Sequence, residues 1–434
     1  MYKRFGNHLA SKLSLIFGIA WITCGLLLVN PLSQADQGKV VSVFAATCNT
    51  PTTSFCDAMM PPIPGWTGHV FRLSQNYPIA SIMDTQPWMQ FDPQKQPEQY
   101  INAVLGYFYE GNIRDNVEES FDPTQNSVRN WFNAPWQDFG LNGREFVHGL
   151  TRERVSRTFE LEPHQKSQWN NYAVGFYNMP GATTIAKMWA DHGNPNPDFA
   201  SMPEGTVAAK LLFTTANVDE VPYLNGAPQW NAYVYSNPND PAPKPNSPRK
   251  ILPVRLLQID IAVKDSRVAE TTGWVFGTFV YGGGPNGTEG VGWNNVAPVG
   301  LMWGNDPGFT GSGQLTQTWL NPNVHMPHVG YQGRLNGPID NKVSSCLSCH
   351  ATAELPIGVM VPPANTDTSK WFQNIPSGTP FDVDRKSLDY SLQLQVGIQN
   401  FLTSNQTHKA FTLKALGMED AELKSSDIPA REGN

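Results

Sequence analysis

Hydrophobic and polar residues first follow a helical pattern between residues 98 and 110. The segment EQYINAVLGYFYE repeats apolar residues at helical spacing, with Pro97 before it and Gly111 after it. The apolar stripe consists of Tyr100, Ile101, Val104, Leu105 and Phe108. The pattern predicts one helix whose apolar face packs against a core.

From about residue 206 the pattern changes to short segments that are rich in β-branched and aromatic residues. These segments are TVAAKLLFTTA, QWNAYVYS, LPVRLLQIDIAV, GWVFGTFVYG and VGLMWG, and turn residues separate them. Because no helical run of any length lies between them, a parallel sheet with crossover helices is not expected. We predict an α+β, mainly β fold: an antiparallel sandwich or roll with a few helices.

Residues 388–399 alternate strictly between apolar and polar side chains. A period of two favours a strand, whereas the Leu and Gln content of the segment favours a helix. We expect a strand here, with the helix as the alternative.

A dense group of aromatic residues follows the predicted helix. Its members are Trp131, Phe132, Trp136, Phe139 and Phe146. Such a group could stack against a sugar or a quinone, but large aromatic side chains more often build a core. We expect these residues to belong to the core.

The N-terminus has the order of a secretory signal peptide. Basic residues precede an apolar run from Leu13 to Val29, and the small residues Ser33 and Ala35 follow. The alternative is an uncleaved anchor, because the run is near the minimum length for crossing a bilayer. We expect residues 1–35 to be removed and the mature chain to be periplasmic.

Net charge narrows the classes of partner. The chain carries a formal charge of −7, and removing residues 1–35, which hold three basic and no acidic residues, gives about −10. An acidic chain is poorly suited to nucleic acid or anionic lipid, and it would attract a basic partner. No later stretch is apolar for long enough to cross a bilayer, so we expect no stable membrane insertion after signal removal.

Four cysteines remain in the mature chain. Cys48 and Cys56 lie in the polar segment CNTPTTSFC, which predicts a disulfide that closes a short loop in an oxidising compartment. Cys346 and Cys349 then remain for the segment CLSCH, which ends at His350.

Three kinds of site compete for this Cys-x-x-Cys-His spacing. A zinc site needs four ligands, and the chain has no second cysteine pair to spare, although His325 and His328 could complete one. A redox dithiol would leave the histidine without a function. In covalent haem attachment every residue has a function, because two thiols add to the vinyl groups and the adjacent imidazole binds the iron. We therefore predict one haem c on Cys346, Cys349 and His350.

The motif resembles that of c-type cytochromes, a similarity limited to residues 346–350 and their neighbours. Other segments resemble those of large bacterial single-haem proteins that are assigned only to the cytochrome c family. Examples are NGREFVHGLTRERVSR, TGWVFGTFVYG, PVGLMWGNDP and GRLNGPIDN. This wider resemblance spans most of the mature chain, and it implies no particular substrate.

The sixth ligand of the iron would decide between electron transfer and chemistry at the iron. Met360 lies ten residues beyond His350, and that segment could extend about 33 Å, enough to round the edge of a haem. The alternative is that Met360 only packs in the pocket. The other candidate ligands are His325, Met326, His328 and Met418.

Arg144 and Arg152 in the segment GREFVHGLTRER are candidate contacts for the haem propionates. Guanidinium groups suit partly buried anions because they donate two parallel hydrogen bonds. The alternative is that Glu145 and Glu153 pair with these arginines on a solvated surface.

Together these patterns predict a signal peptide at 1–35, an aromatic-rich loop and helix region at 36–150, a β-rich body at 151–340 and a haem-binding segment at 341–434. We expect a periplasmic cytochrome that transfers single electrons, with a periplasmic redox protein or a membrane-bound electron-transfer complex as its partner. The alternatives are a haem enzyme with an open sixth position, which the length of the chain favours, and a ligand-binding redox or gas sensor.

Overall fold

The structure is a computed structural model that describes residues 55, 73–81, 84–113, 121–137, 144–145, 147–240, 247–282, 290–324 and 329–415, with side chains up to residue 403. The described residues belong to one compact unit. Several predictions fall outside the described residues: the signal peptide, the disulfide between Cys48 and Cys56, and the aromatic and ligand candidates Phe139, Phe146, His325, Met326, His328 and Met418.

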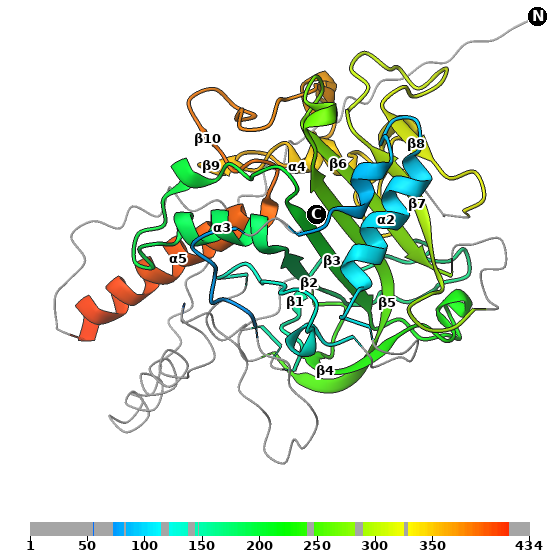
Figure 1. The fold of residues 1–434 in the computed structure, drawn as a ribbon. Helices are drawn as coiled ribbons and strands as arrows, with labels where there is room; N and C mark the ends of the chain where they lie inside the picture. The colour runs from blue at the N-terminus through cyan, green and yellow to red at the C-terminus, as the bar shows by residue number, and fades with distance from the viewer. Residues whose placement is uncertain are drawn as a thin grey trace, which may run out of the picture. The chain divides into compact units, whose positions relative to one another are not determined.

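The described residues contain ten strands and four α-helices, together with short 3-10 helices and loops (Figure 1). The strands are β1 Thr151–Arg152, β2 Asn171–Tyr177, β3 Val207–Thr214, β4 Gln229–Tyr235, β5 Arg249–Lys264, β6 Trp274–Tyr281, β7 Val296–Met302, β8 Thr318–Leu320, β9 Glu354–Leu355 and β10 Lys386–Ser387. The helices are α2 Pro97–Tyr109, α3 Met179–Met188, α4 Cys346–His350 and α5 Leu392–Ala415. In this part of the chain no helix has both the length and the hydropathy that a bilayer crossing requires.

The first eight strands form one antiparallel sheet. Its order is β1-β2-β3-β5-β6-β7-β8, and β4 pairs with the first half of β5 while β6 pairs with the second half. Strand β5 has 16 residues, so it is long enough to pair with both β4 and β6 along the same edge. The prediction of a mainly β, antiparallel fold with few helices is therefore confirmed.

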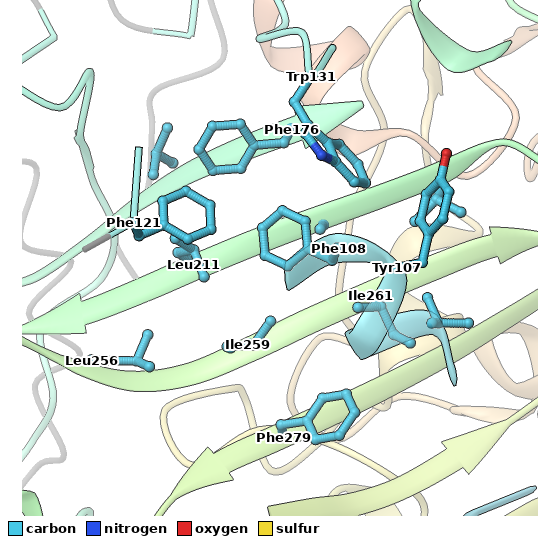
Figure 2. Close-up of a cluster of buried hydrophobic side chains, with 14 of the residues drawn as sticks. Tyr107, Phe108, Phe121, Trp131, Phe176, Leu211, Leu256, Ile259, Ile261 and Phe279 are labelled. Carbon is cyan, nitrogen blue, oxygen red and sulfur yellow. The ribbon is translucent and has the colours of Figure 1, made fainter. Parts of the chain in front are cut away.

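Helix α2 covers one face of the sheet, and the prediction for residues 98–110 is confirmed within one residue at each end. Its buried residues pack against the side chains of β3, β5 and β6 that point to this face, including Leu211, Ile259 and Phe279 (Figure 2). Gly277 on β6 makes room for the helix, since a Cβ atom there would lie 2.5 Å from the Cδ1 of Ile101. The aromatic residues Trp131, Phe132 and Trp136 are buried, as expected of a core.

The opposite face of the sheet carries α3, α4 and α5. Leu347 of α4 and Leu394 and Ile398 of α5 belong to one buried cluster with Phe276 and Met302 of the sheet. Side chains point alternately to the two faces of a strand. The residues of β5 and β6 that face this layer are therefore adjacent in sequence to those that face α2. This second layer contains the Cys-x-x-Cys-His segment.

The predicted strand at residues 388–399 is wrong, because α5 begins at Leu392. Burial explains the error: Leu394, Gln395, Ile398 and Phe401 are buried, and this spacing is helical. Gln395 occupies a core position because its side-chain oxygen accepts a hydrogen bond from the backbone N–H of Glu354 at 2.9 Å. The alternation of Leu and Gln therefore does not mark alternate faces.

Candidate functional site

The Cys-x-x-Cys-His segment forms a single short helix, α4. Ser345 caps its N-terminus: the Ser345 hydroxyl accepts from the backbone N–H of Ser348 at 3.1 Å, and the Ser348 hydroxyl accepts from the backbone N–H of Ser345 at 2.8 Å. This reciprocal capping box satisfies two backbone donors that the first turn leaves unpaired. Leu347 anchors the turn in the core with no exposed surface.

Cys346, Cys349 and His350 share one face of α4. They are three and four residues apart, which places side chains on the same side of a helix, and all three are half-buried while Leu347 and Ser348 are buried. Both cysteines are free thiols in the structure. The turn therefore presents two thiols and an imidazole together.

Both thiols remain protonated at neutral pH. Burial, followed by repulsion from Asp340, raises the pKa of Cys349 to about 12 and that of Cys346 well above its ordinary value. Redox-active dithiols have the opposite property, since a lowered pKa supplies the reactive thiolate. This argues against the dithiol interpretation of the motif.

His350 is held by one hydrogen bond to the backbone. Its Nδ1 lies 2.8 Å from the carbonyl oxygen of Tyr390. Burial lowers the pKa of His350 to about 4, so the ring is neutral near pH 7. Because a carbonyl can only accept, Nδ1 carries the proton and Nε2 carries the lone pair that a metal would need.

A polar row on the sheet lies next to the motif. Lys210 of β3, Asp260 of β5 and Thr278 of β6 are cross-strand partners. Lys210 forms an ion pair with Asp260 at 3.1 Å, and the Thr278 hydroxyl donates to Asp260 at 2.9 Å and lies 3.9 Å from the sulfur of Cys346. Burial alone would lower the pKa of Lys210, but attraction to Asp260 outweighs it and raises the pKa.

Asp340 adds a second carboxylate beside this row. Burial, and then repulsion from Asp260, raises the pKa of Asp340 above its ordinary value. A raised pKa means that the folded chain binds the proton more tightly than the unfolded chain. Stability is therefore lost as the pH rises from the ordinary value for aspartate through the raised value of the folded state.

Replacing Asp340 with Asn should consequently stabilise the chain at pH 7. The neutral amide avoids the cost of burying a charge and the repulsion from Asp260. Asn also keeps an acceptor for the Gly337 N–H, now 2.8 Å from the carboxylate. Urea unfolding at pH 7 and at pH 3 measures the effect, which should disappear at the lower pH. The exposed Asp219 provides the control as Asp219→Asn. A gain of equal size at both pH values would contradict the argument.

Met360 lies outside the core, with 42% of its surface exposed. Its sulfur accepts a hydrogen bond from the side-chain amide of Gln395 at 3.6 Å. Ligation of the iron by Met360 thus stays a prediction, and the loop that carries Met360 would have to bring the sulfur to the iron.

The two arginines that were candidates for propionate contact have protein partners. Arg144 is buried and donates to the carbonyl oxygen of Ala134. Arg152 donates to the side chain of Asn170 at 3.1 Å and to the carbonyl oxygen of Asp240 at 2.6 Å. Their contact with propionates stays a prediction.

The alternative, in which Glu145 and Glu153 pair with these arginines, also stays a prediction. Glu145 accepts from the backbone N–H groups of Val147 and His148, at 3.0 and 2.7 Å. Arg154 pairs with Glu160 at 2.7 Å.

Sequence reasoning missed the residues that the fold brings close to the motif from distant segments. Tyr390 contacts His350 through a backbone atom, which has no signature in the sequence, and it lies in the segment that was expected to be a strand. The Lys210–Asp260 pair depends on the register of two strands. Only a correct pairing of β3 with β5 would have revealed it.

The described residues contain no group of three or more His, Cys, Asp and Glu side chains arranged to hold a metal ion without a cofactor. The residues that could complete a zinc site, His325 and His328, lie outside this part of the chain, so the zinc alternative stays open. No family model, curated protein or solved structure matches the chain.

Proposed function

We propose that this chain is a periplasmic c-type cytochrome that holds one haem on Cys346, Cys349 and His350 and transfers single electrons between redox partners. The observation that carries the proposal is the geometry of α4: two free thiols and a neutral imidazole share one half-buried face. The imidazole is already oriented by the Tyr390 carbonyl. The residues therefore fit the group.

Each residue of the motif would have a defined role. The S–H bond of each cysteine would add across one vinyl group, so that sulfur bonds to one carbon and the hydrogen to its neighbour. Protonated thiols supply both atoms. His350 would offer Nε2 to the iron, while its Nδ1–H continues to donate a hydrogen bond to the carbonyl oxygen of Tyr390. Proteins usually orient a histidine ligand through such a bond. When bound, the haem supplies a centre that gains and loses one electron.

A haem enzyme with an open sixth position is the second candidate function. Two observations favour it: the sulfur of Met360 accepts a hydrogen bond from Gln395, and the row of Lys210, Asp260 and Thr278 brings hydrogen-bonding side chains close to the motif. Polar groups beside a ligand-accessible iron can orient a bound substrate by hydrogen bonds.

An optical spectrum of the haem-loaded chain, ferric and ferrous, before and after carbon monoxide, separates these functions. The cytochrome proposal predicts haem that stays with the chain after denaturation and a low-spin ferrous spectrum that carbon monoxide does not change. Immediate binding of carbon monoxide would favour the enzyme. A chain without covalent haem, made in a host that attaches haem c, would contradict both.

If carbon monoxide does not bind, Met360→Ala should open the sixth position. The expected result is a ferrous iron that binds carbon monoxide and a lower reduction potential, because a thioether ligand raises the potential. Met89 is a matched control, since it is also 42% exposed. If Met360→Ala behaves like Met89→Ala, the sixth ligand is another residue.

A further inference from the structure

The chain makes an unusual corner just before α5. Asp389 and Tyr390 are consecutive residues with positive φ angles, 48° and 68°, although neither is glycine. Both are buried, at 1% and 5% exposure. Left-handed backbone is disfavoured for residues with a Cβ atom, and it persists only where the surroundings impose it. Two such residues in succession therefore call for a physical cause.

The carboxylate of Asp389 supplies that cause by collecting donors from separate segments. It accepts from the backbone N–H of Met202 at 2.7 Å, from the indole N–H of Trp274 at 2.9 Å and from the hydroxyl of Ser377 at 2.5 Å. The ammonium of Lys264 lies 3.1 Å away. Because these donors converge on one buried carboxylate, the position of Asp389 is fixed relative to the sheet.

The next residue, Tyr390, contacts the imidazole of the motif. The carbonyl oxygen of Tyr390 accepts the hydrogen bond from Nδ1 of His350 at 2.8 Å. The phenol of Tyr390 donates to the carbonyl oxygen of Ile375 at 2.5 Å, which holds the far end of the same residue. The direction of the Tyr390 carbonyl depends on the backbone angles at the corner, and the corner depends on Asp389.

We propose that Asp389 is a positioning residue for His350: it fixes the left-handed corner that aims the Tyr390 carbonyl at the imidazole. The effect on an iron centre rests on the proposed function, whereas the orientation and tautomer of the ring are properties of the chain alone. A firm acceptor on Nδ1–H makes Nε2 a better electron donor, which favours ferric over ferrous iron.

The first test needs no haem. In the haem-free chain labelled with ¹⁵N-histidine, the His350 nitrogens should show a single tautomer, with the proton on Nδ1. Asp389→Asn should give a mixture of the two tautomers, because an amide cannot accept from all of these donors. Ser377→Ala removes one donor only, so it should cause a smaller change in the same direction, and it keeps the proposal testable if Asp389→Asn does not fold.

Asp265→Asn is the matched control. Asp265 is buried as well, and its carboxylate also binds a cation and an aromatic side chain: Arg267 at 2.6 Å and the hydroxyl of Tyr100 at 2.9 Å. Tyr100 belongs to helix α2, on the opposite face of the sheet. Asp265→Asn should therefore weaken the fold without changing the His350 tautomer. If both aspartate variants change the tautomer equally, the effect comes from general loosening and the proposal is wrong.

The second test uses the haem-loaded chain and its reduction potential. Asp389→Asn should shift the potential to a more positive value, Ser377→Ala should shift it less, and Asp265→Asn should leave it unchanged. A folded Asp389→Asn chain with the wild-type tautomer and potential would overturn the inference and leave the cytochrome proposal intact. If the wild-type chain takes up no haem, the cytochrome proposal fails, while the tautomer measurement still decides the role of Asp389.

Discussion

A chain in which Cys346 and Cys349 are both replaced by serine is expected to carry no haem after denaturation. Serine has nearly the same size as cysteine, so α4 should form with its cap and its Leu347 anchor unchanged. The hydroxyls, however, cannot form thioether bonds. Each single variant should keep one covalent bond, so we expect haem on the single variants and none on the double variant. The mass of the denatured chain gives this result directly.

Before denaturation, the double variant shows whether the imidazole can bind haem without the two thioether bonds. His350 and the Tyr390 carbonyl are not altered, so haem that binds without a covalent bond should still be coordinated by the imidazole. Cys48→Ser is the control, because Cys48 is predicted to belong to a disulfide and its replacement should leave haem attached. Haem that survives denaturation on the double variant would exclude Cys346 and Cys349 as the attachment points, and with them the proposed function.

The sequence allowed most of the sheet and helix α2 to be predicted, because their signals are local. Each strand from β3 to β7 is a short run of β-branched and aromatic residues, and α2 places its buried side chains at helical spacing. The position of the candidate motif could also be read from the sequence, because Cys346, Cys349 and His350 lie at a spacing that one helical turn brings to the same side.

The parts that could not be predicted depend on contacts between distant segments. Helix α5 was taken for a strand because Gln395 looks solvent-exposed in a sequence, yet it is buried through its bond to the backbone of Glu354. The orientation of His350 depends on Tyr390, forty residues away. It also depends on Asp389, whose donors come from β5, β6 and two loops. No local pattern encodes such convergence.

Arg334 is another residue whose importance appears only in the folded chain. It is 1% exposed, and its guanidinium donates to the carbonyl oxygens of Asn305 at 2.8 Å, Asp306 at 2.9 Å and Tyr331 at 3.2 Å. The group also lies over the ring of Phe372, 4.5 Å from its centroid. Asn305 in turn accepts a hydrogen bond from Ser345, the N-cap of α4, at 3.1 Å. Arg334 thus connects the loops that support the start of the motif.

Arg334→Ala is expected to lower the free energy of unfolding by on the order of 3 kcal/mol, because several buried carbonyl groups lose their donor together. Arg334→Lys should recover little of this loss, since an ammonium group cannot donate in the directions of a planar guanidinium. Urea unfolding of the haem-free chain measures both variants. Less haem should also be attached to Arg334→Ala, because the cap of α4 loses its support.

The exposed Arg157 gives the control, since its replacement by alanine removes the same side chain from the surface. We expect a change within about 0.5 kcal/mol for Arg157→Ala, as for most surface substitutions. If Arg334→Ala costs no more than Arg157→Ala, the hydrogen bonds of Arg334 do not support the fold, and the start of α4 must be held by its own capping box alone. If stability falls but haem attachment does not, the motif forms independently of the loops that Arg334 connects.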